Sequence, residues 1–258
     1  METERRSYFG SVAETYEKTR PGYPSIIVER INAYAGHAEG GRALDVGCGT
    51  GKGTACLIAG GWQVTGVDID ERMLHVARAA VPQARFLASE VGRLGEHFEP
   101  QNFDLVAAFE AAHWFVHDVE IAQLRRVLKP GGALCLINRE RAPEDTFHAT
   151  IRGVLSGYVQ QWPQAQQFQV GFDARDICRR VGCTKIEAFD LQQANPYTPG
   201  EAAQFARTKS HFAHVPQKHQ EHALRHLERV FEDQAAARER QVVESVSLMR
   251  LVCGRLPG

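Results

Sequence analysis

Hydrophobic and polar positions follow two alternating patterns between residues 42 and 138. Short apolar runs rich in β-branched residues, which are typical of buried strands, are separated by longer segments in which apolar residues recur at helical spacing. We predict strands at 42–46, 63–67, 85–88, 103–108 and 133–137. We predict helices at 54–59, 71–80 and 120–128, with Lys-Pro-Gly-Gly at 129–132 forming a helix-to-strand turn. Strands that alternate with helices in this way predict an α/β fold with a doubly wound, mostly parallel sheet.

The regular alternation ends after residue 138. Residues 140–180 carry an amphipathic helical pattern, 184–191 are predicted to form a strand, 199–245 are rich in predicted helix, and 247–253 are a final apolar run. A helical cap inserted around the last two strands explains this order. A chain of 258 residues is long enough for one enzyme-sized domain, so we expect a single domain over 1–258.

Net charge and hydropathy limit the classes of binding partner that we expect. The formal net charge is −1, so no excess of positive charge favours nucleic acid or an anionic membrane. The N-terminal segment is polar, and no apolar run approaches membrane-spanning length. We therefore expect a soluble, cytoplasmic protein with no nucleic-acid partner and no membrane association. The six cysteines include no C-x-x-C pair and lie mostly in apolar segments, which favours reduced, packed thiols over disulfides or zinc ligands.

A glycine-rich segment, Asp45-Val-Gly-Cys-Gly-Thr-Gly-Lys-Gly-Thr54, follows the first predicted strand and precedes the first predicted helix. In an open parallel sheet such a loop lies at the carboxyl edge, where these folds bind ligands. A phosphate-binding P-loop would need glycine at 46 and a hydroxyl residue at 53, which are Val46 and Gly53. The dinucleotide fingerprint would need a third glycine at 52 or 54, which are Lys52 and Thr54. The spacing G-x-G-x-G lets a ligand approach the backbone without building a pyrophosphate cradle.

The second predicted strand leads into Asp68, 17 residues after Gly51. An acidic side chain at this edge accepts hydrogen bonds from both hydroxyls of a ribose, as in NAD enzymes and other adenosine-binding enzymes. Asp68 therefore predicts an adenosine ligand without choosing the class of enzyme. Asp70 is interpreted as the N-cap of the next helix.

The pattern Asp45-x-Gly47-x-Gly49-x-Gly51 resembles motif I of the class I S-adenosylmethionine-dependent methyltransferases. That cofactor carries an ammonium and a sulfonium but no phosphate, so an acidic residue at the loop attracts it where a pyrophosphate would be repelled. The sequences LASEV at 87–91, EAAHWF at 110–115 and LRRVLKPGG before the fifth strand extend the resemblance over about residues 40–140. The resemblance implies a Rossmann-like sheet of seven strands with the last strand antiparallel. It divides the domain into an N-terminal helical lid at 1–40, a cofactor-binding core at 41–140, and the helical cap with the last two strands at 141–258.

The N-terminal sequence YEKTRPGYP at 16–24, together with AAHWF at 111–115, resembles the small-molecule subgroup that includes the trans-aconitate methyltransferases. In that subgroup the N-terminal segment folds over the cofactor, and an arginine at the position of Arg20 contacts the methionine carboxylate. A guanidinium fork suits a carboxylate; the alternative is that Tyr16 and Tyr23 pack in the core and Arg20 lies at the surface. The cofactor-binding residues that the resemblance implies are Tyr16, Arg20, Asp45, Gly47, Gly49, Gly51, Asp68, Ile69, Ser89, Glu90 and Phe109.

Methyl transfer is an in-line displacement, so the protein chiefly has to hold the acceptor atom near the methyl group. His113, just beyond the fourth strand, is the best-placed general base, and Glu110 is a weaker alternative. The other interpretation of His113 and Trp114 is that they only wall the acceptor pocket. Arg139 and Tyr197 are further candidates for acceptor binding. The remaining cationic and aromatic residues of the cap leave both an anionic and a flat aromatic acceptor open: Arg141, Arg207, Lys209, Tyr158, Trp162, Phe172, His211 and Phe212.

Five histidines between His211 and His226 lie in an ordinary charged, amphipathic pattern without a cysteine, so we interpret them as a solvated helix face and expect no metal site. The sequence predicts a monomeric or homodimeric S-adenosylmethionine-dependent methyltransferase. Its expected acceptor is an O or N atom of a small molecule, either a carboxylate or an aromatic or heteroaromatic metabolite. Two alternatives stay open: an NAD-linked oxidoreductase, and a regulatory protein that binds S-adenosylmethionine without catalysis.

Overall fold

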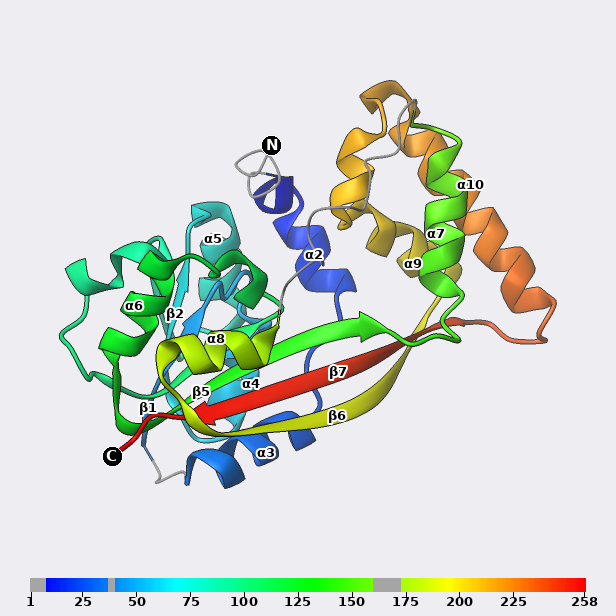
Figure 1. Cartoon of the computed structure of the whole chain (residues 1–258). Coiled ribbons are helices and arrows are strands. Elements are labelled where there is room, and N and C mark those ends of the chain that lie inside the picture. Colours follow the sequence, from blue (N-terminus) through cyan, green and yellow to red (C-terminus); the bar gives the residue numbers. More distant parts are fainter. Residues whose placement is uncertain (1–7, 37–39, 160–172) are drawn as a thin grey trace. The chain divides into compact units, whose positions relative to one another are not determined.

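The computed structural model describes residues 8–36, 40–159 and 173–258 (Figure 1). Trp162 and Phe172, named above for the acceptor pocket, lie outside the described residues. Within the described residues, seven strands form one sheet in the order β3-β2-β1-β4-β5-β7-β6. The strands are β1 (Arg42–Val46), β2 (Gln63–Asp68), β3 (Arg85–Ala88), β4 (Phe103–Phe109), β5 (Leu128–Arg141), β6 (Thr184–Tyr197) and β7 (Val243–Arg255).

The direction of the strands matches the predicted fold class. β1 pairs in parallel with β2 and with β4, β2 pairs in parallel with β3, and β4 pairs in parallel with β5. β7 runs antiparallel between β5 and β6. The crossover helices are α4 (Lys52–Ala59), α5 (Glu71–Ala80) and α6 (Asp118–Val127). The predicted doubly wound sheet with an antiparallel last strand is confirmed.

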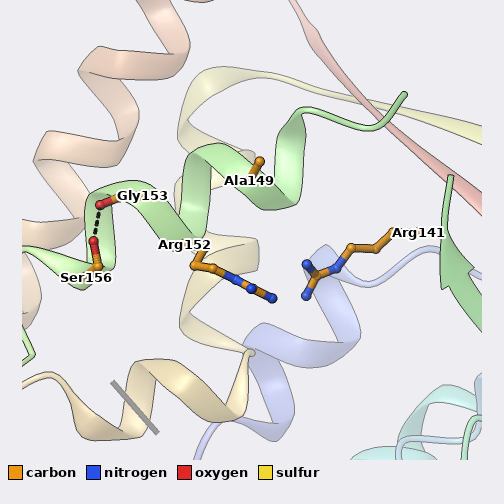
Figure 2. A pocket seen from close by; sticks show the side chains of 5 residues that line it. All are labelled: Arg141, Ala149, Arg152, Gly153 and Ser156. Carbon is orange, nitrogen blue, oxygen red and sulfur yellow. Dashed lines mark hydrogen bonds between the residues drawn. The ribbon is translucent and has the colours of Figure 1, made fainter. Parts of the chain in front are cut away.

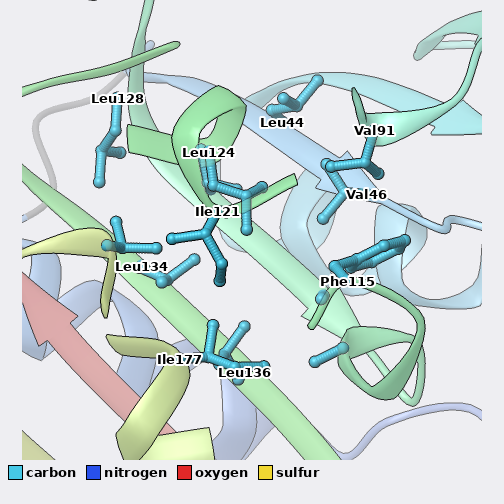
Figure 3. Packing of buried hydrophobic residues seen from close by; sticks show 14 of the residues in the cluster. Leu44, Val46, Val91, Phe115, Ile121, Leu124, Leu128, Leu134, Leu136 and Ile177 are labelled. Carbon is cyan, nitrogen blue, oxygen red and sulfur yellow. The ribbon is translucent and has the colours of Figure 1, made fainter. Parts of the chain in front are cut away.

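Local sequence explains where the crossover helices begin and which face they bury. Asp70 caps α5 as predicted, because the backbone N–H of Arg72 donates to its Oδ1 atom at 2.9 Å. α6 carries Ile121 and Leu124 at helical spacing, and Figure 3 shows both side chains in the cluster that also contains Leu134. All three side chains are buried, so the burial of apolar surface holds α6 against the sheet.

The turn predicted at 129–132 is instead part of β5. Leu128 already pairs with Phe103 on β4, and the next pair joins Ala133 to Leu105. The residues Lys-Pro-Gly-Gly form a bulge between these two pairs, with Gly131 in the left-handed region at φ 72°. The proline and glycines do interrupt regular pairing, but the chain belongs to the same strand on both sides of them.

The chain divides into two compact units, which we name the sheet unit and the helical unit. The sheet unit contains the described residues of 22–139, 173–190 and 249–258. Besides β1 to β4 and the crossover helices it holds α3 (Ser25–Ala35), α8 (Ala174–Val181) and the 3-10 helices Val91–Glu96 and Ala112–Trp114. The division of the chain into domains that the sequence suggested stays a prediction.

The helical unit contains the described residues of 8–21, 140–159 and 191–248. Its elements are α2 (Ala13–Thr19), α7 (Phe147–Ser156), α9 (Pro199–Arg207), the 3-10 helix Ser210–His214 and α10 (Gln217–Ala236). The strands β5, β6 and β7 continue from one unit into the other. In chain order, α7 precedes β6, while α9, the 3-10 helix and α10 lie between β6 and β7.

Aromatic side chains form the core of the helical unit. Phe147 stacks on Tyr197 and on Phe231, with ring centroids 5.1 Å apart in both pairs. Phe205 meets Phe147 edge to face at 5.3 Å. β6 reaches Tyr197, beyond the predicted end at 191. The prediction ended too early because most side chains of this strand are exposed or half-buried, so no apolar run marks its second half.

Candidate active site

The glycine loop between β1 and α4 has a backbone that only glycine adopts readily. Gly47, Gly49 and Gly51 all have positive φ, at 68°, 54° and 89°. A Cβ atom on Gly47 would also lie 2.5 Å from Cβ of Ala111. The every-second-residue spacing read from the sequence is therefore a requirement of the chain path.

Four amides of this loop are used inside the protein. The N–H groups of Gly47 and Cys48 both donate to the carbonyl oxygen of Val67, at 2.8 and 3.0 Å. The N–H of Gly49 donates to Oδ2 of Asp68 at 2.9 Å, and that of Gly51 donates to the Cys48 carbonyl at 2.9 Å. A phosphate cradle needs such amides to point at the ligand, so these four do not form one.

Asp45, one residue before the end of β1, carries a buried carboxyl group. Its Oδ2 accepts a hydrogen bond from Oγ1 of Thr54 at 2.7 Å, while its Oδ1 has no partner within the described part of the chain. Burial raises the pKa of Asp45 to about 7, and the neighbouring charge of Asp68 acts in the same direction. A positive group near Asp45 would favour its ionised form, which fits the predicted ammonium better than a phosphate.

Asp68, the last residue of β2, is hydrogen-bonded to the glycine loop. Besides the Gly49 amide at Oδ2, its Oδ1 accepts the N–H of Asp70 at 2.9 Å. Burial raises the pKa of Asp68, and these backbone hydrogen bonds oppose the rise. Each carboxylate oxygen has a second lone pair, so the predicted role toward ribose hydroxyls is compatible with the anchoring role, which the sequence did not reveal.

The residues that follow β2 and β3 lie at one edge of the sheet, because Asp68 pairs with Ala88 at the ends of the two strands. Ile69 is a large apolar residue that lies on the surface, with 44% of it exposed. The Ser89 amide donates to the Asp68 carbonyl at 3.0 Å, and Glu90 is exposed. An exposed apolar side chain beside polar groups is suited to the face and edge of a purine base.

The end of β4 is strained and closely packed. Glu110 has φ 55°, an uncommon conformation for a residue other than glycine. The ring of Phe109 packs on the first turn of α4, because a Cβ atom on Gly53 would lie 2.3 Å from its Cδ2. Phe109 also contacts Tyr23, with ring centroids 4.7 Å apart. Phe109 therefore lies beside the start of α4, and its role toward the cofactor stays a prediction.

Arg139 at the end of β5 joins this group. Its Nε lies 3.7 Å from Oε1 of Glu110, its Nη2 donates to the carbonyl oxygen of Gly22 at 3.2 Å, and its guanidinium lies 5.2 Å from the ring centre of Tyr23. The structure thus brings Arg139, Glu110 and Phe109 together. Sequence reasoning missed Gly22 and gave Tyr23 only a packing role, although both lie in the YEKTRPGYP motif.

His113 lies in the 3-10 helix after β4. Its ring is half-buried and lies 4.8 Å from the ring of Trp114. Burial lowers the pKa of His113, and the charge of Glu110 opposes this shift. The imidazole is therefore mostly neutral at pH 7, which is the form that accepts a proton. Its roles as base or as pocket wall stay predictions.

Three predicted site residues belong to the helical unit. The Nε of Arg20 donates to Oγ1 of Thr208 at 2.8 Å, its Nη2 donates to the Thr208 carbonyl at 3.1 Å, and its guanidinium lies 4.4 Å from the ring centre of Phe205. Tyr16 lies against the same guanidinium, at 5.1 Å, and Tyr197 stacks on Phe147. Their roles toward cofactor and acceptor stay predictions.

The described ranges contain neither a cluster of metal ligands nor a membrane-spanning helix. No group of three or more histidine, cysteine, aspartate or glutamate side chains there could hold a metal ion. Of the histidines of α10, His226 has its Nδ1 3.0 Å from the hydroxyl of Tyr158. No described helix has the length and apolar character needed to cross a membrane.

Residues 44–136, which carry the glycine loop, Asp68 and His113, match the model of a family described as a methyltransferase domain. This segment is similar to a methyltransferase domain. It spans the strands from β1 to β5 and their crossover helices. Enzymes of the family use S-adenosylmethionine, the cofactor that the glycine loop predicted.

Curated relatives are similar to about half of this chain. An uncharacterized methyltransferase of Mycobacterium tuberculosis is 36% identical over 129 residues, which are 50% of this chain and 51% of the relative. A trans-aconitate 2-methyltransferase of an Enterobacter species is 34% identical over 147 residues, which are 54% of this chain and 55% of the relative. The chain spans about half the length of the curated relatives it matches.

Solved structures share the fold over most of the chain. A provisionally assigned type II methyltransferase of Anaeromyxobacter dehalogenans has a TM-score of 0.68 at 22% identity, covering 93% of this chain and 99% of that chain. Phosphoethanolamine N-methyltransferase 2 of Haemonchus contortus, solved with phosphomonomethylethanolamine and S-adenosylhomocysteine, has a TM-score of 0.54 at 19% identity, covering 96% of this chain and 58% of that chain. The fold is that of the class I methyltransferases.

Proposed function

We propose that this chain transfers the methyl group of S-adenosylmethionine to an O or N atom of a small molecule. The observation that carries the proposal is the loop of residues 47–51 inside the methyltransferase domain, with a carboxyl group at the end of each strand beside it. Asp45 and Asp68 supply negative charge and hydrogen-bond acceptors, and the glycines leave the backbone open to close approach. When bound, the cofactor supplies an electrophilic methyl group on a positively charged sulfur.

The residues divide into those that bind and those that handle the acceptor. Asp68 is expected to accept hydrogen bonds from ribose hydroxyls, while Ile69 covers the base. Asp45 favours the ammonium of the methionine part through its charge. On the acceptor side, neutral His113 accepts the proton that an O–H or N–H group loses as it is methylated, and Arg139 orients the acceptor through hydrogen bonds.

An NAD-linked oxidoreductase is the weaker alternative. Four amides of the loop already donate within the protein, and Lys52 occupies the position of the third glycine that a pyrophosphate site requires. The acceptor class is less constrained. The trans-aconitate methyltransferases among the relatives favour a carboxylate, while Trp114 suits an aromatic or heteroaromatic metabolite.

Calorimetric titration with S-adenosylhomocysteine and with NADH tests the proposal. We expect saturable binding of S-adenosylhomocysteine and none of NADH. A second step supplies radiolabelled S-adenosylmethionine with a panel of small carboxylates, phenols and amines, and follows the label into product. Binding of NADH alone would exclude the methyltransferase. Binding of S-adenosylhomocysteine with no labelled product across the panel would favour the non-catalytic alternative.

A matched pair of variants locates the cofactor site. Asp68→Asn keeps the size of the side chain but removes its charge and one acceptor oxygen, so we expect S-adenosylhomocysteine to bind more weakly. Asp190→Asn serves as the control, because Asp190 is half-exposed and pairs with Arg250 at 2.8 Å. Equal affinity in the two variants would remove Asp68 from the site.

A further inference from the structure

The helix α7 of the helical unit has one apolar face and one open face. Phe147, Ile151 and Leu155 recur at every fourth position and are buried. The other face carries Arg152 among small residues. With Arg141 from the end of β5, this face lines a hollow of about 400 Å³ whose lining residues are Arg141, Ala149, Arg152, Gly153 and Ser156.

Two guanidinium groups face each other across this hollow. Figure 2 shows the side chain of Arg152 extending from α7 and that of Arg141 extending from the opposite side, with their nitrogen ends toward one another. Within the described residues, neither group forms a hydrogen bond or an ion pair. Partial burial lowers the pKa of Arg141, and the charge of Arg152 adds to this effect. The two cations repel each other.

One acidic group offsets part of this repulsion. The charge of Asp145 raises the pKa of Arg141, but the side chain of Asp145 is fully buried and already has partners within the protein. Its Oδ1 accepts the N–H of Val246 at 2.9 Å, and its Oδ2 contacts Nδ1 of His148 at 2.6 Å. Burial lowers the pKa of His148 to about 3, and the charges of Lys209 and Arg141 contribute to the fall. A third cation, Lys209, thus lies close to the same region.

We propose that the hollow between Arg141 and Arg152 binds a small oxyanion, a carboxylate or phosphate group. A guanidinium presents paired N–H donors that match the two oxygens of such a group, and an anion between two cations removes their repulsion. The small side chains of Ala149 and Gly153 leave the space that the anion needs. This site lies wholly in the helical unit and does not depend on methyl transfer.

Calorimetric titration of the full chain with inorganic phosphate and with succinate at low ionic strength tests the site. We expect saturable binding that weakens as sodium chloride is added, and roughly tenfold or greater loss of affinity in Arg141→Gln and in Arg152→Gln. Arg240→Gln is the matched control, because Arg240 lies in the same unit and pairs with Glu244 at 3.4 Å. Absence of binding by the unaltered chain, or equal affinity in all three variants, would overturn the proposal.

A second variant keeps both arginines and fills the hollow. A Cβ atom on Gly153 would meet no atom within 4 Å, so Gly153→Leu should fold, and it replaces a poor helix former within α7. We expect this variant to unfold at the same or a higher temperature and to bind phosphate and succinate at least tenfold more weakly. Unchanged affinity in Gly153→Leu would also contradict the proposed site.

The anion has two possible sources, the charged end of a methyl acceptor or a separate anion. If it is the acceptor, Arg152→Gln raises the KM for that acceptor and leaves the affinity for S-adenosylhomocysteine unchanged. If it is separate, phosphate changes the rate of methyl transfer without competing with the acceptor, and Arg152→Gln removes that effect. Binding of the anion and binding of S-adenosylhomocysteine are measured separately, so failure of one proposal leaves the other testable.

Discussion

At the scale of single residues, burial sets the protonation state of two groups near the glycine loop. Asp45 is fully buried, and its pKa rises to about 7. His113 is half-buried, and its pKa falls below its usual value near 6.5. The same physical cause therefore favours the neutral form of an acid and of a base. The shift at His113 predicts a pH dependence of methyl transfer, and the shift at Asp45 predicts a pH dependence of stability.

His113→Gln tests the role of this side chain as the base. If His113 accepts a proton, methyl transfer by the unaltered chain rises with pH through a pKa below 6.5 and is constant above it. His113→Gln should lack that rise and slow turnover by roughly 10² to 10⁴, with unchanged affinity for S-adenosylhomocysteine. The measurement is the pH profile of kcat beside a binding titration. His219→Gln, at an exposed position of α10, is the control, and an unchanged profile in His113→Gln would assign His113 to the pocket wall.

Asp45 should make the free chain less stable at alkaline pH. Its native pKa of about 7 lies above the unfolded value near 3.8, so its contribution to stability is fully present below pH 3.8 and is lost as the pH rises through 7. The change in unfolding free energy is at most on the order of 4 kcal/mol. Asp45→Asn does not titrate, so its stability relative to the unaltered chain should increase from pH 5 to pH 8, as measured by urea unfolding.

Asp104→Asn is the control for this experiment because the pKa of Asp104 moves the other way. Burial opposes ionisation of Asp104, but hydrogen bonds from Lys129 and from the Arg42 amide outweigh it and hold the pKa below its usual value. The stability that Asp104 contributes is therefore lost only as the pH falls toward that lowered pKa. The difference between Asp104→Asn and the unaltered chain should be constant from pH 5 to pH 8. A parallel result for the two variants would contradict the assignment at Asp45.

At the scale of elements, the loop between β1 and α4 is defined by backbone conformation and close packing. Gly47→Ala places a side chain at φ 68° and 2.5 Å from Cβ of Ala111. We expect a loss of about 1–3 kcal/mol in unfolding free energy and roughly tenfold weaker binding of S-adenosylhomocysteine. Gly157→Ala is the control, since Gly157 has φ −71° and its nearest new contact is 3.4 Å. Urea unfolding and calorimetry give both values, and equal behaviour of the variants would remove the strict need for glycine at 47.

The same loop shows which features of the candidate site can be predicted from the sequence. The first strand, the glycine spacing and Asp68 can each be recognised from a short stretch of sequence. The geometry of parallel strands then places them at one edge of the sheet, where they form the candidate site. The sequence predicts a turn at 129–132, where the structure has a bulge within β5. Proline and glycine indicate an irregular backbone, but they do not show whether the chain continues in the same strand. The contacts of Arg139 with Gly22 and Tyr23 join residues far apart in the chain, and no periodic pattern encodes such a pairing.

At the scale of the whole molecule, the chain passes between its two units several times. The sheet unit holds the residues proposed for the cofactor loop, while the helical unit holds Arg20 and the hollow of Arg141 and Arg152. The sequence predicted a helical cap from composition and periodicity alone. It did not predict that Arg141 and Arg152 would face each other, because both resemble ordinary surface charges until the fold brings β5 and α7 to the same hollow.

Hydrogen exchange, which reports protection along the whole chain, assigns each ligand to its unit. S-adenosylhomocysteine should slow exchange of the amides at 47–51, 68–70 and 88–91, since binding to the native state suppresses local opening. Inorganic phosphate should instead slow exchange in α7, at 147–156. Slower exchange at 13–20 with S-adenosylhomocysteine would support the predicted contact of Arg20 with the methionine carboxylate, and unchanged exchange there would assign Arg20 to its bonds with Thr208. If S-adenosylhomocysteine slowed exchange in α7 but not at 47–51, the proposed cofactor site would be contradicted, because the ligand would then not contact the glycine loop.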